Sequence, residues 1–332
     1  MTDAVVVVGV ACELEDADIA RIEALDPRIE VRRITREQLA DEATTLAAVA
    51  EIEVLLTFWG GRWQRTADLA TLAPRLRWVQ LASAGGDAVL HMLDRGVTFT
   101  TAAGVNASVI AECVLTYMLI FAKRWPEALR HQQAHEYTRF MPGEIAGATV
   151  GIVGFGHIGA EVAKRVRVLG CRVLATRRSL VLTAGGATPH PDVDEMLPSE
   201  ALPRLLAESD YLVLAAPLTA ETRNLIDAAA LRAMQRSAVL INVSRGELVD
   251  EPALIEALRD GTIAGAALDV TVQEPLPPES PLWDLPNVVL TPHISGIAPH
   301  HFTRVTDIFL DNLRRYLAAE PLANRIDAAR GY

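Results

Sequence analysis

The sequence contains few cysteines, and they lie far apart. Cys12, Cys113 and Cys171 are the three in a chain of 332 residues, and none belongs to a CxxC pair. A disulfide framework or a zinc site needs cysteines grouped at short or regular intervals, so this spacing argues against both. We therefore expect a protein of a reducing compartment, the cytoplasm, with no metal.

Positively charged residues are also few relative to acidic ones. Lysine and arginine together number 31, against 42 aspartates and glutamates, which leaves a formal net charge of -11. Binding of nucleic acid requires a basic face that neutralises phosphates. We therefore expect no nucleic-acid partner, and an anionic substrate would have to be bound by local positive charge.

Long apolar runs are missing as well. The run 5–10 is short and follows no positively charged segment, so we expect no signal peptide. The run 114–122 is bounded by Glu112 and by Lys123, and it is too short to cross a bilayer. It is typical of a buried helix, and we expect no membrane partner.

The sequence does contain a regular alternation of short β-rich runs and helical stretches. Half of its residues are hydrophobic, which suffices for real cores, and its length suits two ordinary domains. The alternation predicts an α/β fold with two open, doubly wound parallel sheets and an active site in the crevice between them. The predicted strands are 5–8, 30–33, 54–57, 78–82, 98–101, 149–153, 172–175, 211–215, 238–242, 266–270 and 288–291, and the predicted long helices are 108–123 and 302–317.

A dinucleotide-binding motif follows the strand 149–153. The sequence there reads G-x-G-x-x-G, with its glycines at Gly154, Gly156 and Gly159. In such a motif the first glycine permits a tight turn, the second lets backbone approach a diphosphate, and the third lets the helix pack on the strand. The diphosphate would bind the amides near His157 and Ile158, at the positive end of the helix dipole. The alternative is a glycine-rich turn without a ligand.

The turn after the next strand departs from the pattern of NAD enzymes. Those enzymes carry an acidic residue there, which binds the adenosine ribose hydroxyls. This chain instead has Thr176, Arg177, Arg178 and Ser179. Two guanidiniums and two hydroxyls suit a ribose 2′-phosphate, because arginine offers several donors to phosphate oxygens. We expect NADP(H) to be favoured, with NAD(H) possible; a solvated basic turn is the alternative.

Three polar side chains follow buried strands in the last third of the chain. Arg245 can bind a carboxylate and polarise a ketone oxygen. His293 can donate a proton in reduction and accept it in oxidation, and Glu274 can orient the imidazole and favour its charged form. Singly, each has an ordinary structural reading: a strand-end ion pair, a core histidine or a surface turn residue. Together they suit the reduction of a 2-keto acid.

The phrases around these residues resemble the catalytic segments of the D-isomer-specific 2-hydroxyacid dehydrogenase family, in particular of glyoxylate/hydroxypyruvate reductases. The phrases are Asn242-Val-Ser-Arg245-Gly, Asp269-Val-Thr-Val-Gln-Glu274-Pro-Leu-Pro and Thr291-Pro-His293. The resemblance covers nearly the whole chain. It implies hydride transfer between NAD(P)H and a small 2-keto acid or D-2-hydroxy acid, with Arg245, Glu274 and His293 as the catalytic triad.

The resemblance also implies a wider set of contacts. Asp269 would contact the nicotinamide end, and the amides of Ala84 and Gly85 would bind the substrate carboxylate together with Arg245 and His293. Gly86 departs from the family, in which a bulkier apolar residue is common at this position. The remaining cofactor contacts that it implies are Ala216, Pro217, Thr222, Val243, Ser244, Arg245, His293 and Gly296.

The family fold implies a Rossmann cofactor domain inserted into a flavodoxin-like substrate domain. The expected boundaries are 1–102 with 298–332 for the substrate domain and 103–297 for the cofactor domain. A homodimer is implied too, because the apolar helix 108–123 and the segment to Met141 have more hydrophobic surface than one small domain readily covers. Phe58 and Trp59 either line the substrate pocket or pack in a core.

Two other functions deserve comparison. A formate-type dehydrogenase of the same superfamily would have glutamine at position 274, where this chain has Glu274. A cofactor-sensing binding protein, similar to the family's transcriptional corepressors, could keep the triad without turnover. Oxidation of NADPH that depends on a keto acid separates that binding protein from an enzyme.

Overall fold

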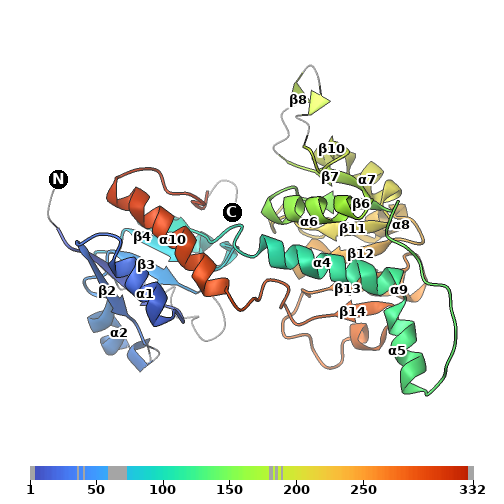
Figure 1. Cartoon of the computed structure of the whole chain (residues 1–332), viewed down its shortest axis with the longest axis horizontal. Coiled ribbons are helices and arrows are strands. Elements are labelled where there is room, and N and C mark those ends of the chain that lie inside the picture. Colours follow the sequence, from blue (N-terminus) through green and yellow to red (C-terminus); the bar gives the residue numbers. More distant parts are fainter. Residues whose placement is uncertain are drawn as a thin grey trace. The chain divides into compact units, whose positions relative to one another are not determined.

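A computed structural model describes residues 4–35, 37–39, 42–58, 73–178, 182–183, 186–187 and 190–327. The chain divides into two compact units. Unit 1 comprises residues 1–105 and 298–332, and unit 2 comprises residues 106–297. Each unit is built on its own parallel sheet with helices on both faces (Figure 1).

The sheet of unit 1 has the strand order β2-β1-β3-β4-β5, and its strands are parallel throughout. This is the doubly wound order of flavodoxin-like folds, with its switch point between β1 and β3. All five strands that the sequence predicted for this part of the chain are present. Their bounds are β1 Val6–Ala11, β2 Ile29–Arg33, β3 Val54–Thr57, β4 Trp78–Leu81 and β5 Thr98–Thr100.

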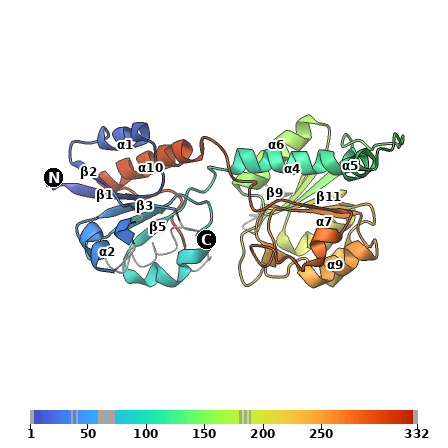
Figure 2. The same cartoon turned by 90° about the horizontal axis from the view of Figure 1, so that it is seen from below.

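Helices cover both faces of this sheet (Figure 2). Successive residues of a strand point to opposite faces, so Val8 of β1 packs beneath α1 and α10, whereas Val7 packs on the side of α2. The helices are α1 Asp16–Glu23, η1 Glu37–Leu39, α2 Glu42–Val49, η3 Asp87–Arg95 and α10 His301–Leu317. Helix α10 comes from the C-terminal part of the chain. Unit 1 is therefore formed by two segments, one before and one after unit 2 in the sequence.

Helix α10 is held to the sheet by stacked rings and by a buried polar network. Trp78 stacks on Phe309, with ring centroids 5.2 Å apart. Nδ2 of the Asn312 side chain donates to Gln80 Oε1 at 3.0 Å and to the Ala323 carbonyl at 3.1 Å. Its Oδ1 accepts from the Ala323 backbone amide at 2.8 Å. Asn312 and Gln80 are both fully buried, so the bond between them satisfies groups that water cannot reach.

Replacing Asn312 with alanine is expected to destabilise unit 1 by about 1–3 kcal/mol, because the buried Gln80 side chain and the Ala323 amide and carbonyl each lose a partner. Urea denaturation, with hydrogen exchange at α10 and β4, measures the loss. The control is Asp311→Ala, which removes an exposed ion pair with Arg315 on the same helix and should cost less than about 1 kcal/mol. Equal stability of the two variants would contradict a structural role for the network.

The sheet of unit 2 has the order β10-β7-β6-β11-β12-β13-β14 and is also parallel. The six strands predicted here are present, but β10 was missed, because it is a three-residue edge strand of which only Leu197 is buried. The strands are β6 Thr149–Val153, β7 Arg172–Thr176, β10 Glu195–Leu197, β11 Tyr211–Leu214, β12 Val239–Asn242, β13 Gly265–Leu268 and β14 Val288–Leu290, with β8 Leu182–Thr183 and β9 Gly186–Ala187 as a separate antiparallel pair.

Two groups of helices enclose this sheet (Figure 2). Val213 of β11 packs with α4 and α6, whereas Leu212 and Leu214 pack with the helices on the other face. The helices are α4 Ala107–Ala122, α5 Trp125–Gln133, α6 His157–Val168, η4 Ser199–Ala201, α7 Leu202–Glu208, α8 Ala228–Ala233, η5 Gly246–Leu248, α9 Glu251–Arg259 and η6 Pro281–Asp284. Among the described residues, none of the helices has the length and apolarity needed to cross a membrane.

Candidate active site

The glycine motif forms a loop that only glycine can build at two positions. Gly154 has a φ of 94°, and a Cβ there would lie 2.6 Å from the backbone of Ala216. A Cβ on Gly159 would lie 2.6 Å from the Gly154 carbonyl oxygen. At Gly156, in contrast, a Cβ would meet nothing within 4 Å. The first and third glycines therefore close the loop, and the second leaves backbone open to a ligand.

The start of α6 suits a diphosphate. The helix begins at His157, with Gly156 at the N-cap position and no side chain capping its first turn. Amides of this turn are therefore left for a ligand at the positive end of a 12-residue helix. His157 is exposed, and Ile158 packs against the core of unit 2. These residues fit the diphosphate of a dinucleotide.

The arginine turn lies at the end of β7, as the sequence predicted. Thr176 is buried, whereas Arg177 and Arg178 are exposed. Arg178 forms an ion pair with Glu221, with Nη1 and Oε2 3.0 Å apart. Glu221 lies 43 positions further along the chain, so the sequence pattern did not indicate this partner. Ser179 lies outside the described residues.

The other segments predicted to contact the cofactor lie together at the ends of β11 and β12. The Ser244 hydroxyl donates to the Ala216 carbonyl. The Thr222 hydroxyl donates to the Pro217 carbonyl at 2.7 Å, and Val243 is buried beside Ser244. Because Ala216 also contacts the glycine loop, the structure joins these segments to the dinucleotide motif.

Three neighbouring strands end at the same level of the sheet. Asn242 of β12 pairs with Leu268 of β13, which pairs with Leu290 of β14. Arg245, Glu274 and His293 follow these strands in that order. Parallel register therefore places the three predicted catalytic residues in loops at one edge of one sheet.

One feature brings two of these loops into contact, and a second fixes the loop of Arg245. A Cβ on Gly246 would lie 2.0 Å from the carbonyl carbon of Thr271, so only glycine lets the loop of Arg245 approach the loop that leads to Glu274. The buried Asn242 side chain donates to the Arg245 carbonyl at 2.9 Å and accepts from the Ser244 amide at 3.1 Å. The sequence reasoning assigned no role to Asn242, although a buried amide that ends an apolar strand is itself a signal.

His293 and Glu274 form the pair that the sequence predicted. Nδ1 of His293 lies 2.7 Å from Oε2 of Glu274, and Oε1 of Glu274 accepts from the Thr271 amide at 3.2 Å. Since a carboxylate can only accept, Nδ1 carries the hydrogen of this bond, and Nε2 faces away from the pair. The two side chains are 51% and 39% exposed, so a substrate can reach them.

Asp269 lies at the end of β13 and is almost completely buried. Its carboxylate accepts hydrogen bonds from the segment that carries His293 rather than from solvent. That segment ends at Gly296, where a Cβ would lie 3.2 Å from the Asn106 side chain. The sequence reasoning did not find this anchoring role for Asp269.

Ala84 and Gly85 belong to unit 1, in the loop after β4. The Ser83 hydroxyl donates to the Gly85 carbonyl at 2.9 Å. Within the described part of the chain, the Ala84 and Gly85 amides donate to no backbone carbonyl. Gly86 is buried against Ile326, whose Cδ1 would lie 2.5 Å from a Cβ at this position.

Phe58, at the end of β3, packs in the core of unit 1. Its ring centroid is 6.3 Å from that of Phe302 and 6.4 Å from that of His301, both edge-on. Core packing is therefore observed for Phe58, and Trp59 lies outside the described residues.

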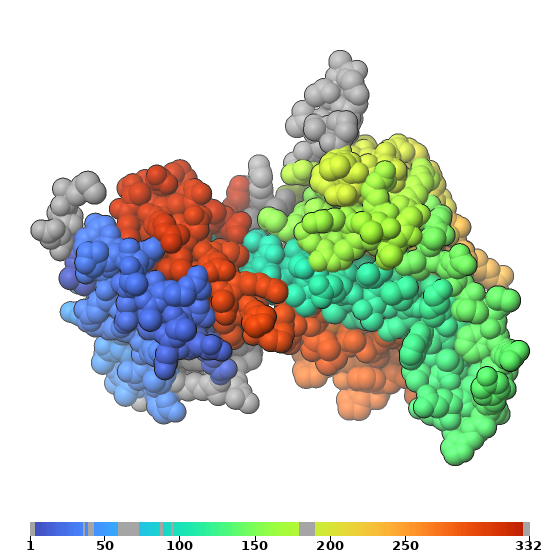
Figure 3. All heavy atoms as spheres, viewed as in Figure 1, coloured from blue at the N-terminus to red at the C-terminus, as the bar shows by residue number. Residues whose placement is uncertain are grey.

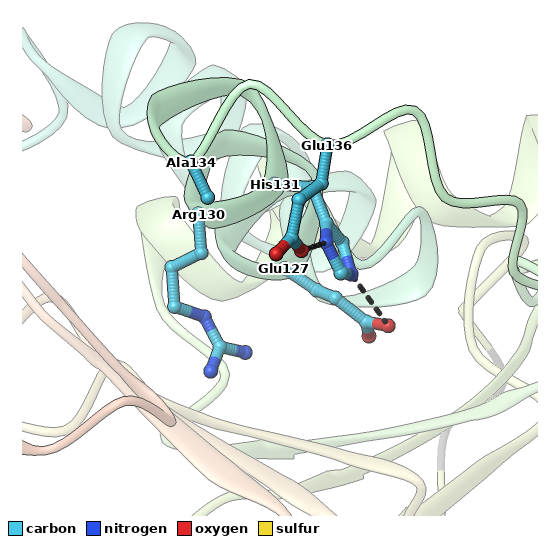
Figure 4. A pocket seen from close by; sticks show the side chains of 5 residues that line it. All are labelled: Glu127, Arg130, His131, Ala134 and Glu136. Atoms are coloured by element: carbon cyan, nitrogen blue, oxygen red, sulfur yellow. Dashed lines mark hydrogen bonds and ion pairs between the residues drawn. The ribbon is translucent and has the colours of Figure 1, made fainter.

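A hollow of about 310 Å³ lies on α5, away from the strand ends (Figure 4). Charged side chains line it, with His131 between Glu136, 2.9 Å away, and Glu127, 3.9 Å away. It contains none of the predicted catalytic or cofactor residues. Within the described ranges, no cluster of three potential metal ligands occurs.

Comparisons with known proteins agree with this geometry. Residues 115–295 match the NAD binding domain of D-isomer specific 2-hydroxyacid dehydrogenases. A glyoxylate reductase of Thermococcus kodakarensis is 37% identical over 83% of both chains, and a glyoxylate/hydroxypyruvate reductase B of Pectobacterium carotovorum is 38% identical over 78% of this chain and 82% of its own.

A crystal structure of a D-isomer specific 2-hydroxyacid dehydrogenase from Xanthobacter autotrophicus, in complex with NADPH and MES, superposes with a TM-score of 0.82. It is 32% identical and covers 99% of this chain and all of its own. Sequence and structure therefore agree over both units. The chain belongs to the D-isomer specific 2-hydroxyacid dehydrogenase family, whose NAD binding domain lies within unit 2.

Proposed function

We propose that the protein reduces a small 2-keto acid to the D-2-hydroxy acid with a nicotinamide cofactor. The observation that supports this most is the 2.7 Å bond between His293 and Glu274. It lies at strand ends that also carry Arg245, on a sheet whose first loop is built for a dinucleotide. Unit 2 would bind the cofactor, and unit 1, with Ala84 and Gly85, would bind the substrate carboxylate.

Each side chain has a distinct task in this reaction. The reduced nicotinamide, when bound, supplies the hydride. His293 holds a proton on Nε2 for the developing alkoxide oxygen, and Glu274 stabilises the imidazolium through Nδ1. The guanidinium of Arg245 binds the carboxylate and polarises the ketone. In oxidation the same His293 nitrogen accepts the proton.

The substrate class follows from the relatives. The curated relatives above are named for reduction of glyoxylate and hydroxypyruvate, and both compounds present the carboxylate and carbonyl that these residues would bind. We therefore propose small 2-keto acids of this kind. A panel of keto acids assayed with NADPH and NADH tests the proposal. Cofactor binding without turnover on any of them would instead favour a sensing protein.

Replacing His293 with alanine is expected to lower turnover by about two or more orders of magnitude, because the alkoxide loses its proton donor. Cofactor affinity, measured by quenching of protein fluorescence or by calorimetry, should stay nearly unchanged. Near-normal turnover of this variant would contradict the role of His293 as proton donor.

The companion variant is Glu274→Gln, which keeps the size of the side chain. Without its anionic partner the imidazolium of His293 is less favoured. The limb of the pH profile that reports reduction should therefore move to lower pH. A pH profile that matches the wild type would show that Glu274 does not act on His293.

We further propose a preference for NADPH. The end of β7 carries no acidic residue at the ribose position, and Arg177 and Arg178 are exposed there. The ion pair of Arg178 with Glu221 does not prevent Arg178 from binding a phosphate. Glu221 is largely exposed, and exposed ion pairs contribute about 0–1 kcal/mol to stability. A charge-assisted bond to a phosphate contributes about 1.5–3 kcal/mol. The NADPH bound to the Xanthobacter relative also supports this choice.

The double variant Arg177→Ala/Arg178→Ala is expected to reduce kcat/KM for NADPH by about ten- to a hundredfold and to leave NADH nearly unaffected. The matched control is Arg232→Ala/Arg259→Ala, which removes equal charge from exposed positions on α8 and α9. Wild-type preference for NADH, or an unchanged preference in the first variant, would show that the arginine turn is merely solvated.

We also propose that the protein is a homodimer. Most of α4 is covered within its own unit, by α6 and the sheet. Four of the exposed large apolar side chains lie on α5 and the segment after it, which are at the surface of unit 2 (Figure 3). Tyr137 and Met141 are 95% and 83% exposed, and Trp125 and Leu129 are about half exposed. A second copy, contacting through the same patch, would cover them.

Sedimentation at micromolar concentration is therefore expected to show a dimer. Leu129→Glu should shift the equilibrium toward monomer, because it introduces a charge into the apolar patch. Val168→Glu, at an exposed apolar position on α6, should leave the dimer intact. A wild type that sediments only as monomer would refute the proposal.

A further inference from the structure

A single buried carboxylate anchors the segment that carries His293. Oδ1 of Asp269 accepts from the Thr291 hydroxyl at 2.6 Å and from the Ile294 amide at 2.9 Å, and Oδ2 accepts from the Ser295 amide at 3.0 Å. Asp269 and Ser295 are nearly inaccessible to solvent. One donor before His293, Thr291, and two donors after it, Ile294 and Ser295, therefore bind the same carboxylate.

The backbone of His293 depends on this anchoring. Its φ is 52°, in the left-handed region that residues other than glycine rarely adopt. Its amide donates to the Asp269 carbonyl at 2.8 Å, and the two following amides donate to the Asp269 carboxylate. Such a conformation persists only where surrounding bonds enforce it. Asp269 thus sets the direction in which the imidazole leaves the chain.

The hydroxyl next to this carboxylate is itself held from α4. Tyr117 Oη and Thr291 Oγ1 are 2.6 Å apart. Since Thr291 donates its one hydrogen to Asp269, it can only accept from Tyr117, so the phenol donates. Burial, together with the nearby charge of Asp269 and against the opposing effect of the bond to Thr291, raises the pKa of Tyr117 to about 12. The phenol therefore stays protonated, and the direction of the chain of bonds is constant at working pH.

From this geometry we infer that Tyr117 and Thr291 are positioning residues for His293, which they align through Asp269. The inference rests on the proposed role of His293 as proton donor. Neither side chain is assigned to contact substrate or cofactor. The hydrogen bonds run from Tyr117 to Thr291, from Thr291 to Asp269, and from the amides around His293 back to Asp269. Loss of either hydroxyl should therefore misalign the imidazole without removing it.

The test uses Thr291→Val, which removes the hydroxyl at nearly constant shape, and Thr291→Ser, which restores it. Thr291→Val should lower kcat about 10- to 100-fold, as expected for a small misplacement of a reacting group, with the Kd for NADPH within about twofold. Thr291→Ser should recover kcat to within about threefold of the wild type. Tyr117→Phe should lower kcat by a smaller factor.

A double-variant cycle shows whether the two hydroxyls act as one chain. Tyr117→Phe should have little further effect in the Thr291→Val background, because the phenol has already lost its acceptor. The control is Tyr211→Phe, which removes another buried phenol of unit 2, on β11, and should leave kcat unchanged. Independent, additive effects, or a Thr291→Val protein with wild-type kcat, would overturn the inference.

A second measurement separates this inference from the proposed function. The imidazole signal of His293 in NMR spectra, assigned with His293→Ala, should shift in Thr291→Val and return in Thr291→Ser. That readout needs no turnover. A shifted signal in a protein that reduces no keto acid would support the positioning role and reject the reaction. An unshifted signal together with normal reduction would reject the positioning role alone.

Discussion

The candidate site depends first on the parallel register of β12, β13 and β14. Because Asn242, Leu268 and Leu290 lie side by side in adjacent strands, the chain leaves the sheet three times at one level. Each exit carries one group of the proposed chemistry. An antiparallel strand would have sent its following loop to the opposite edge. The register, rather than any one side chain, makes these groups neighbours.

Close backbone packing then turns neighbouring loops into one structure. At Gly154 and at Gly246, backbone from another segment lies where a Cβ would be. The first contact joins the dinucleotide loop to Ala216, and the second joins the Arg245 loop to Thr271. Interiors are dense and transmit strain, so a side chain at either glycine would displace a segment that contributes to the site.

Buried polar side chains fix the loop conformations that backbone packing alone does not determine. Asn242 and Asp269 each end an apolar strand, and each binds backbone of the loop that follows or lies beside it. In unit 1, Asn312 does the same between α10 and the segment at Ala323. Such groups must be fully bonded when buried, so each permits few arrangements of its loop. Loop geometry in both units is therefore held by buried polar side chains of the regular elements or of the residues that directly follow them.

The sequence by itself determined the strands of both sheets, except for β10, since a run such as 211–215 is apolar enough to be buried on both faces. It also determined the glycine motif and the chemistry available at Arg245, Glu274 and His293. These are properties of residue type and local spacing. Only the tertiary structure decided that Arg178 pairs with Glu221, that α4 is covered while Tyr137 and Met141 stay exposed, and that Asp269 binds the segment of His293. Each of these contacts joins residues distant in the chain or depends on which face is covered, and no local pattern encodes that.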